Sequence, residues 1–88
     1  MIAAPWFLYL LACENGYLYC GITNDVKRRF QAHRQGKGAK FTRINPPQKI
    51  LGVEPFSSRS EASVAEVKLK RKRKEQKLEW AARHPWEG

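Results

Sequence analysis

The stretch WFLYLLACENGYLYCGI, residues 6–22, decides the fold of this chain. Its first part, Trp6 to Ala12, is aromatic and aliphatic, which predicts a buried strand. Glu14-Asn15-Gly16 is a turn signal, and Tyr17 to Ile22 predicts a second strand. We therefore expect the two strands to pair as an antiparallel hairpin.

The length of the turn decides where two tyrosines of this hairpin point. A two-residue loop would put Tyr9 and Tyr19 on opposite faces of the sheet. A three-residue loop over Glu14-Asn15-Gly16 would instead place Tyr9 opposite Gly21 and on the same face as Tyr19. Gly16 suits the left-handed backbone position that ends such a loop, so we expect the second register, with a gap over Gly21. Taken singly, each tyrosine is more often an ordinary strand residue whose hydroxyl reaches water.

Downstream of the hairpin, the pattern continues as a mixture of helix, loop and strand. The expected segments are a helix from a cap at Thr23, Asn24 or Asp25 to about Gln35, a basic loop over Lys37–Pro47, a strand over Gln48–Pro55, a helix that starts at the capping box Ser58-Arg59-Ser60-Glu61, and a last helical segment that ends before His84-Pro85. The sequence thus predicts one α/β domain over residues 1–88, with a basic C-terminal helical segment from about residue 68.

The charge of the chain predicts a partner that carries negative charge. The 88 residues include 17 Lys and Arg against 8 Asp and Glu, a formal net charge of +9. On so small a domain this excess favours polyanions, of which nucleic acid is the most common. The alternative is a basic but nonspecific surface, as on many ribosome-associated proteins.

The cysteines and the N-terminal residues predict the compartment. Cys13 and Cys20 are too few for a disulfide scaffold or a four-thiolate zinc site, so we expect free thiols in a reducing cytoplasm. The apolar run from Ile2 to Leu11 is interrupted by Pro5 and has no basic flank, which argues against a signal peptide, and it is too short to span a bilayer. We expect a cytoplasmic protein that does not associate with membranes.

Two basic side chains border the apolar stripe of the first expected helix. On a helical wheel, Arg29 and His33 lie one turn apart at the edge of the stripe, whereas Lys27 and Arg28 face solvent. An arginine with a packed stem is well placed to bind a phosphate oxygen. The alternatives are a structural ion pair for Arg29 and an ordinary hydrogen-bonded histidine for His33.

One acidic residue of the second expected long helix is unexplained by local structure. Glu66 lies on the apolar face with Ala62 and Leu69, where a carboxylate is costly unless it is paired. Glu61, by contrast, is explained by the capping box. Glu66 could bind Mg²⁺, which commonly takes one or two carboxylates and keeps several waters. It could equally form a buried salt bridge to Arg29 or to a neighbouring lysine.

Two basic segments could follow a phosphate backbone. Lys68–Lys77 holds seven Lys or Arg in ten residues, and Gly36–Arg43 adds three more together with Phe41, an aromatic side chain that could stack on a base. The usual interpretation of a charge run is a solvated helix face. Here the segments indicate a band for a phosphate backbone, with steeply salt-dependent affinity. The candidate nucleic-acid-binding residues are Lys27, Arg28, Lys37, Lys40, Arg43 and Lys68.

Taken together, these residues resemble the GIY-YIG nuclease domain, and closely the small bacterial proteins that consist of that domain alone. The matching stretches are Trp6–Leu11, Tyr19–Thr23, Arg29–His33, Gly36–Arg43, and Ser58–Lys68 around Glu66. The resemblance implies a three-stranded antiparallel sheet flanked by helices, in the order strand, strand, helix, strand, helix, helix.

The resemblance also implies a chemistry, which is metal-dependent hydrolysis of phosphodiester bonds by an endonuclease. One divalent ion, Mg²⁺ or Mn²⁺, would be held by Glu66, and Arg29 would stabilise the phosphate charge. Tyr9 and Tyr19 would activate or position the attacking water, and His33 would assist proton transfer or hold a phosphate. DNA is the favoured substrate, and we expect cleavage to be structure-selective and linked to DNA repair or recombination.

The chain departs from the family pattern at apolar positions. Phe7-Leu8 replaces the glycine and isoleucine of the first motif, and Cys20 replaces the isoleucine of the second, so no polar group is touched. We expect no attached targeting domain, which would leave substrate choice to the core or to a protein partner. The alternatives are a noncatalytic nucleic-acid-binding module and an RNA- or ribosome-associated basic protein. The enzyme is favoured because a carboxylate facing bound phosphate would repel it unless a metal intervened.

Overall fold

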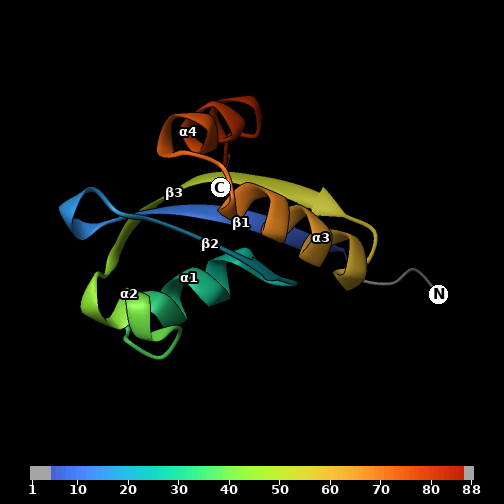
Figure 1. Cartoon of the computed structure of the whole chain (residues 1–88). Coiled ribbons are helices and arrows are strands. Elements are labelled where there is room, and N and C mark those ends of the chain that lie inside the picture. Colours follow the sequence, from blue (N-terminus) through green and yellow to red (C-terminus); the bar gives the residue numbers. More distant parts are fainter. Residues whose placement is uncertain (1–4, 87–88) are drawn as a thin grey trace.

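The central strand of the sheet is the one that begins at Trp6. The structure, a computed structural model, describes residues 5–86, and its strands are ordered β2-β1-β3 with both neighbours antiparallel to β1 (Figure 1). The elements are β1 (Trp6–Cys13), β2 (Leu18–Thr23), α1 (Val26–Arg34), α2 (Lys40–Ile44), β3 (Pro47–Phe56), α3 (Arg59–Lys70) and α4 (Lys74–Arg83). The predicted α/β class, a three-stranded antiparallel sheet flanked by helices, is confirmed.

The hairpin of β1 and β2 has the register expected from a three-residue loop. Tyr9 pairs with Gly21 and Leu11 with Tyr19. Between the strands, Glu14–Gly16 forms a single 3-10 turn in which Asn15 has φ 63° and Gly16 has φ 76°. Both left-handed positions are occupied by residue types that tolerate them. The turn therefore puts Tyr9 and Tyr19 on the same face of the sheet.

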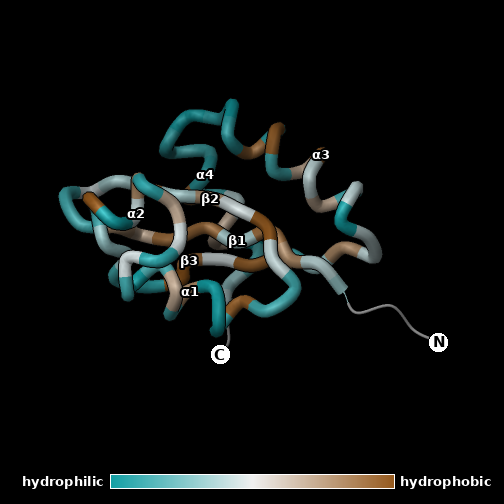
Figure 2. Tube along the Cα trace, turned by 90° about the horizontal axis from the view of Figure 1, so that it is seen from below, coloured by the Kyte–Doolittle hydropathy of each residue, from teal (hydrophilic) through white to brown (hydrophobic). Residues whose placement is uncertain are grey.

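Side chains of β1 alternate between the two faces, and each face has its own cluster. Leu8 and Leu10 pack with Leu69 of α3 and Trp80 of α4. The odd-numbered residues Tyr9, Leu11 and Cys13 face the other way, where Phe30 of α1 packs against them. The strands carry most of the hydrophobic colour, while the turns and the outer helices are mainly hydrophilic (Figure 2). Helices thus cover both faces of a thin sheet.

The helix boundaries follow the capping residues of the sequence. The Asp25 side chain accepts a hydrogen bond from Arg28 N at 3.1 Å, and the Ser58 hydroxyl accepts one from Glu61 N at 3.1 Å. Gly36, with φ 75°, ends the first helix after Gln35. The third strand and the last helix also lie where they were predicted, within two residues.

The segment 37–47 is not simply the loop that the sequence predicted. Lys40–Ile44 forms the short helix α2, which has no side-chain hydrogen bond at its N-cap. Five residues are too few to show a helical period in the sequence or to be stable alone. The helix is held in place by Thr42, which is 0% exposed and turned toward α1. Tertiary contacts, not local propensity, decide this element.

The remaining expectations concern thiols and membranes. Cys13 and Cys20 are both buried and free, as predicted. Within residues 5–86, every helix is too short or too polar to cross a membrane. Ile2, at the start of the apolar N-terminal run, lies outside the described residues.

Docking of α4 on β3 depends on Gly52, which gives the first prediction. A Cβ at Gly52 would lie 2.8 Å from Ala81 Cα and 2.9 Å from the carbonyl oxygen of His84. That carbonyl already accepts a hydrogen bond from Val53 N, so the backbone cannot easily retreat. We expect Gly52→Ala to lower the free energy of unfolding by about 1–3 kcal/mol through overpacking. Urea unfolding followed by circular dichroism measures this change.

The matched control is Lys49→Ala, at an exposed position of the same strand. It should change stability by no more than about 0.5 kcal/mol. Equal stability of Gly52→Ala and the unmodified protein would contradict the close approach of α4.

Candidate active site

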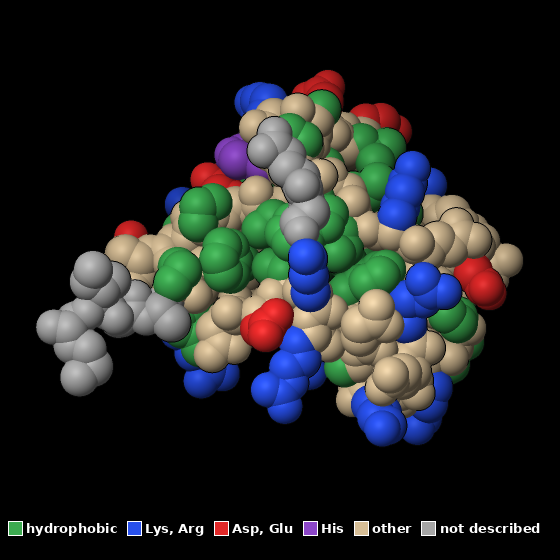
Figure 3. All heavy atoms as spheres, turned by 180° about the vertical axis from the view of Figure 1, so that it is seen from behind, with side chains coloured by type: hydrophobic (Ala, Val, Ile, Leu, Met, Phe, Trp, Pro, Cys, Tyr) green, Lys and Arg blue, Asp and Glu red, His purple; other side chains and the backbone are tan. Residues whose placement is uncertain are grey.

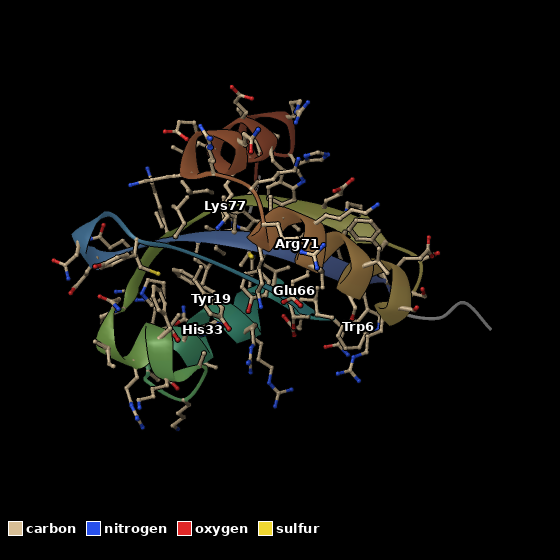
Figure 4. The ribbon with its side chains drawn as sticks, viewed as in Figure 1. Trp6, Tyr19, His33, Glu66, Arg71 and Lys77 are labelled. Carbon is tan, nitrogen blue, oxygen red and sulfur yellow. The ribbon has the colours of Figure 1, made fainter. Side chains whose placement is uncertain are left out.

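The candidate catalytic side chains meet at the free edge of β2. This strand has a neighbour on one side only, because the strand order is β2-β1-β3. In Figure 4, Tyr19 and His33 lie on the α1 side of the strands, and Glu66 points toward that side from α3. The contributing residues are Tyr9 from β1, Tyr19 from β2, Arg29 and His33 from α1, and Glu66 from α3.

Tyr9 lies across Gly21 and fills the space above it. A Cβ on Gly21 would be 2.5 Å from the Tyr9 hydroxyl oxygen and 2.8 Å from its Cζ. The gap expected over Gly21 is therefore occupied by the Tyr9 ring itself. The side chain is 2% exposed, yet its hydroxyl extends toward the edge strand because Gly21 has no side chain to block it.

The Tyr9 hydroxyl belongs to a buried chain of hydrogen bonds. It lies 2.9 Å from His33 Nε2, and His33 Nδ1 lies 2.7 Å from the Thr42 hydroxyl. The Thr42 hydroxyl has one proton, which it donates to the Ala39 carbonyl at 3.0 Å. Thr42 must then accept a hydrogen bond from Nδ1–H, which leaves the Nε2 lone pair to accept one from Tyr9. The chain thus fixes the tautomer of His33 and the direction of the Tyr9 proton.

His33 is buried deeper than its place on the helical wheel predicted. It is 0% exposed instead of lying at the edge, because α2 and Gly38 cover it, and a Cβ on Gly38 would collide with the imidazole ring. Burial, and secondarily the charge of Arg29, lowers the pKa of His33 to about 4. The imidazole is therefore neutral near pH 7. A positive charge nearby would help a tyrosine to ionise, and His33 does not supply one.

The ionisation of Tyr9 reports which charges surround it. Burial raises the pKa of Tyr9 to about 12, although Arg29 opposes the shift, and Tyr19 and Glu66 add to it through their negative charge. The phenol is neutral near pH 7, so it can donate its proton to His33. Arg29 and Glu66 both lie near enough to Tyr9 to affect its pKa, which brings the predicted charged residues to one place.

Glu66 forms the predicted salt bridge to a neighbouring lysine, but the pair is not buried. Its carboxylate lies 3.7 Å from the Lys70 ammonium in an i,i+4 pair, with the two side chains 21% and 54% exposed. Such a solvated pair contributes little stability. Arg29 is exposed and lines an open hollow with Asp25 and Arg28. Both charged groups can therefore be reached by a ligand.

A divalent cation at this site would have few protein ligands. The described residues contain no group of three or more His, Cys, Asp and Glu side chains that could surround a metal. Glu66 alone would hold the ion, and water or phosphate oxygens would supply the remaining ligands, as Mg²⁺ accepts. The partly exposed carboxylate, paired only with Lys70, fits that arrangement.

The predicted nucleic-acid-binding residues are all exposed, on α1, on α2, on the segment between them and on α3. Exposure does not single them out, because Lys and Arg side chains also lie around the hydrophobic centre of the opposite face (Figure 3). The full set is Lys27, Arg28, Lys37, Lys40, Arg43 and Lys68.

Thr42 is the site residue that sequence reasoning missed. Its position nine residues after His33, in a segment taken for a loop, gave no periodic signal. The available signal was a lone threonine among basic and aromatic residues that could supply a hydroxyl to a neighbouring histidine.

Comparison with known proteins agrees with this geometry. The family model described as the GIY-YIG catalytic domain matches residues 5–79. A UPF0213 protein of Xanthomonas axonopodis pv. citri is 53% identical over 81 residues, which cover 92% of this chain and 79% of that protein. A UPF0213 protein of Cupriavidus pinatubonensis is 50% identical over 93% of this chain and 91% of its own length.

Two solved structures have the same fold. The solution structure of a UPF0213 protein from Bacillus halodurans has a TM-score of 0.55 at 35% identity, and that of a protein from E. faecalis has a TM-score of 0.61 at 34% identity. Each comparison covers 89% of this chain and 83% of the other.

The buried neutral His33 predicts a specific loss of stability in acid. In the unfolded chain the imidazole has a pKa of 6.5, against about 4 when folded, so only the unfolded state takes up a proton between these values. The stability that His33 contributes is complete above pH 6.5 and is lost as the pH falls toward 4, by about 3 kcal/mol. In His33→Gln, we expect the decrease in unfolding free energy between pH 7 and pH 4 to be smaller by that amount.

The same shift can be observed directly by NMR titration, in which the His33 signals should titrate near pH 4. The variant His84→Gln removes the only other histidine and assigns the signals. A His33 midpoint near its unfolded value would refute the closed environment described for this side chain.

The hydroxyl of Thr42 predicts the tautomer of His33. Thr42→Val keeps the volume but removes the acceptor of Nδ1–H, so we expect the Nδ1-protonated tautomer to lose its preference and stability to fall by about 1–3 kcal/mol. Thr42→Ser keeps the hydroxyl and should preserve the tautomer. Imidazole ¹⁵N chemical shifts distinguish the two nitrogens, and an unchanged tautomer in Thr42→Val would contradict the chain of hydrogen bonds.

Proposed function

The chain belongs to the GIY-YIG family, and we propose that it is a metal-dependent endonuclease that hydrolyses phosphodiester bonds in DNA. The proposal depends most on one observation: the Tyr9–His33–Thr42 chain of hydrogen bonds lies beside Arg29 and Glu66 at the edge of β2. Hydrolysis of a phosphodiester needs an oriented water, a proton acceptor and positive charge on the phosphate oxygens. Each requirement has a candidate group at this edge.

In this proposal Tyr9 orients the attacking water. Because its own proton is donated to His33, the hydroxyl oxygen keeps lone pairs that can accept a hydrogen bond from water. As the water oxygen bonds to phosphorus, the bond from phosphorus to the leaving sugar oxygen breaks, and that oxygen takes a proton from solvent water. The attacking water gives a proton to the Tyr9 oxygen, and the Tyr9 proton passes to His33 Nε2. With a pKa of about 4, His33 is a weak base, so this transfer proceeds only as the new bond to phosphorus forms. The role of base thus goes to Tyr9 and not to Tyr19.

Arg29 and Glu66 act on the phosphate in this proposal. The exposed guanidinium of Arg29 binds a nonbridging oxygen and offsets the charge that grows there. Glu66 would hold one divalent ion, Mg²⁺ or Mn²⁺, which would supply polarisation of the phosphate and stabilisation of the leaving oxygen. Tyr19, whose ring centroid lies 5.1 Å from that of His33, keeps the imidazole in position.

The substrate is proposed from the positive charge of the surface. The exposed basic side chains Lys27, Arg28, Lys37, Lys40, Arg43 and Lys68 bind backbone phosphates. Contacts of this kind select a shape and not a sequence, which favours cleavage of branched or otherwise irregular DNA, in repair or recombination in the cytoplasm. A protein partner would add targeting.

A noncatalytic nucleic-acid-binding module is the second candidate. It is favoured by the ion pair of Glu66 with Lys70, which can neutralise the carboxylate without a metal. Bound phosphate would then meet less repulsion, and no hydrolysis would follow.

Removal of the Glu66 charge should separate the two candidates. On labelled single-stranded, branched and duplex DNA with Mg²⁺ or Mn²⁺, we expect Glu66→Gln to reduce the cleavage rate by roughly 10²–10³-fold. The variant should keep its fold and its affinity for DNA, because the carboxylate is 21% exposed and belongs to neither hydrophobic cluster, and the amide has nearly the same shape. Cleavage rates and fluorescence anisotropy measure the two quantities.

The matched control is Glu75→Gln, an exposed acid of α4. It should cleave at the rate of the unmodified protein. If the unmodified protein binds every substrate without cleaving any, the noncatalytic module is the correct candidate. Cleavage that survives Glu66→Gln would show that Glu66 was wrongly assigned as the metal ligand.

A further inference from the structure

Three aromatic rings form a strip at the surface beside the hairpin turn. The Phe41 ring stacks on Tyr19 with centroids 5.8 Å apart at 21°, and it meets Tyr17 edge-on at 5.8 Å and 82°. Tyr17 is 52% exposed and Phe41 is 37% exposed. We call Tyr17, Tyr19 and Phe41 the aromatic strip.

The strip is not explained by the packing of the core. Among the described residues, neither Tyr17 nor Phe41 belongs to the two hydrophobic clusters, and Tyr19 is only a partly buried neighbour of one. Aromatic surface that stays exposed to water contributes little to folding. Exposed patches of this kind commonly mark binding sites.

Three lysines face the strip across a groove. One hollow is lined by Tyr19, Phe41, Lys70 and Lys77, and a second is lined by Tyr17, Lys74 and Lys77. Leu18 and Lys77 line both hollows, so the two adjoin along β2, and together we call them the groove. Lys74 Nζ donates a hydrogen bond to the Gly16 carbonyl, 2.6 Å away, which fixes the turn against α4.

The groove begins at the candidate active site. Lys70, on its wall, pairs with Glu66 at 3.7 Å, and the ring centroid of Tyr19 lies 5.1 Å from that of His33. A polynucleotide whose scissile phosphate lies between Arg29 and Glu66 can therefore extend along β2 into the groove.

We propose that this groove binds an unpaired segment of DNA next to the cleaved bond, with bases stacked on the aromatic strip and phosphates against Lys70, Lys74 and Lys77. The inference rests on the proposed function, since it names the substrate class of that same site. Stacking on a protein aromatic needs an open base face, which an unpaired strand offers and a continuous duplex does not. Aromatic side chains on one wall of the groove and lysines on the other match a single strand, whose bases and phosphates lie on opposite sides of its sugars.

The test uses binding in a Glu66→Gln background, so that no cleavage interferes. The ligands are a fluorescein-labelled thymidine dodecamer and a fluorescein-labelled blunt-ended duplex, in which every base is paired. We expect Phe41→Ala to weaken binding of the single strand by roughly 5- to 100-fold, the loss of about one stacked base, and to change duplex binding less than about twofold. Tyr17→Ala should act in the same direction.

The controls separate stacking from folding and from charge. Phe41→Trp should retain single-strand affinity, and Ile44→Ala, 65% exposed on the same helix, should leave both ligands unaffected. Phe41→Leu serves in place of Phe41→Ala if the latter does not fold. Equal losses on both ligands, or no loss on the single strand, would overturn the inference. Failure of the unmodified protein to cleave would instead refute the proposed activity and leave the preference for unpaired DNA measurable.

Discussion

The pairing of Tyr9 with Gly21 across the hairpin is the constraint on which the rest of the structure depends. Because strand side chains alternate, a slip of one residue would turn Tyr9 toward α3 and α4 and remove it from His33. The three-residue turn fixes the register, and the missing side chain at Gly21 lets the hydroxyl approach the sheet edge. Glu66 belongs to α3, which is distant from Tyr9 in sequence, and its charge raises the pKa of Tyr9 across that open edge.

Sequence reasoning predicted the parts of the fold that have a period or a cap. The strands followed from aromatic and aliphatic runs, and the register from Gly16. The helix starts followed from capping residues, which are Ser58 and, among the three candidates for the first helix, Asp25. It missed α2, since five residues carry no period, and it therefore left His33 at an edge that α2 in fact covers. For Glu66, a helical wheel gives a direction but not the distance to solvent, so the surface pair with Lys70 could not be told from a buried one.

Positive charge alone does not mark a binding site on this protein, although the composition predicts a polyanionic partner. The face shown in Figure 3 carries Lys and Arg side chains around its hydrophobic centre, and basic residues are exposed on α1, α2, α3 and α4, so the positive charge raises the local concentration of any polyanion without fixing where it binds. What distinguishes the β2 edge is the combination of one acid, one buried proton chain and the aromatic strip. Thr42 and Phe41 are neighbours on α2, and their side chains belong to the chain of hydrogen bonds and to the aromatic strip respectively, so this short helix links the proposed catalytic site to the proposed binding groove.

The open edge of β2 has a consequence for solubility. A strand with a neighbour on one side only offers unpaired N–H and C=O groups, which other chains can recruit into intermolecular sheets. Lys70, Lys74 and Lys77 stand beside this edge, and charges at a sheet edge disfavour pairing with a second copy of the protein. Replacing these lysines should therefore increase aggregation, apart from any effect on the proposed binding of DNA.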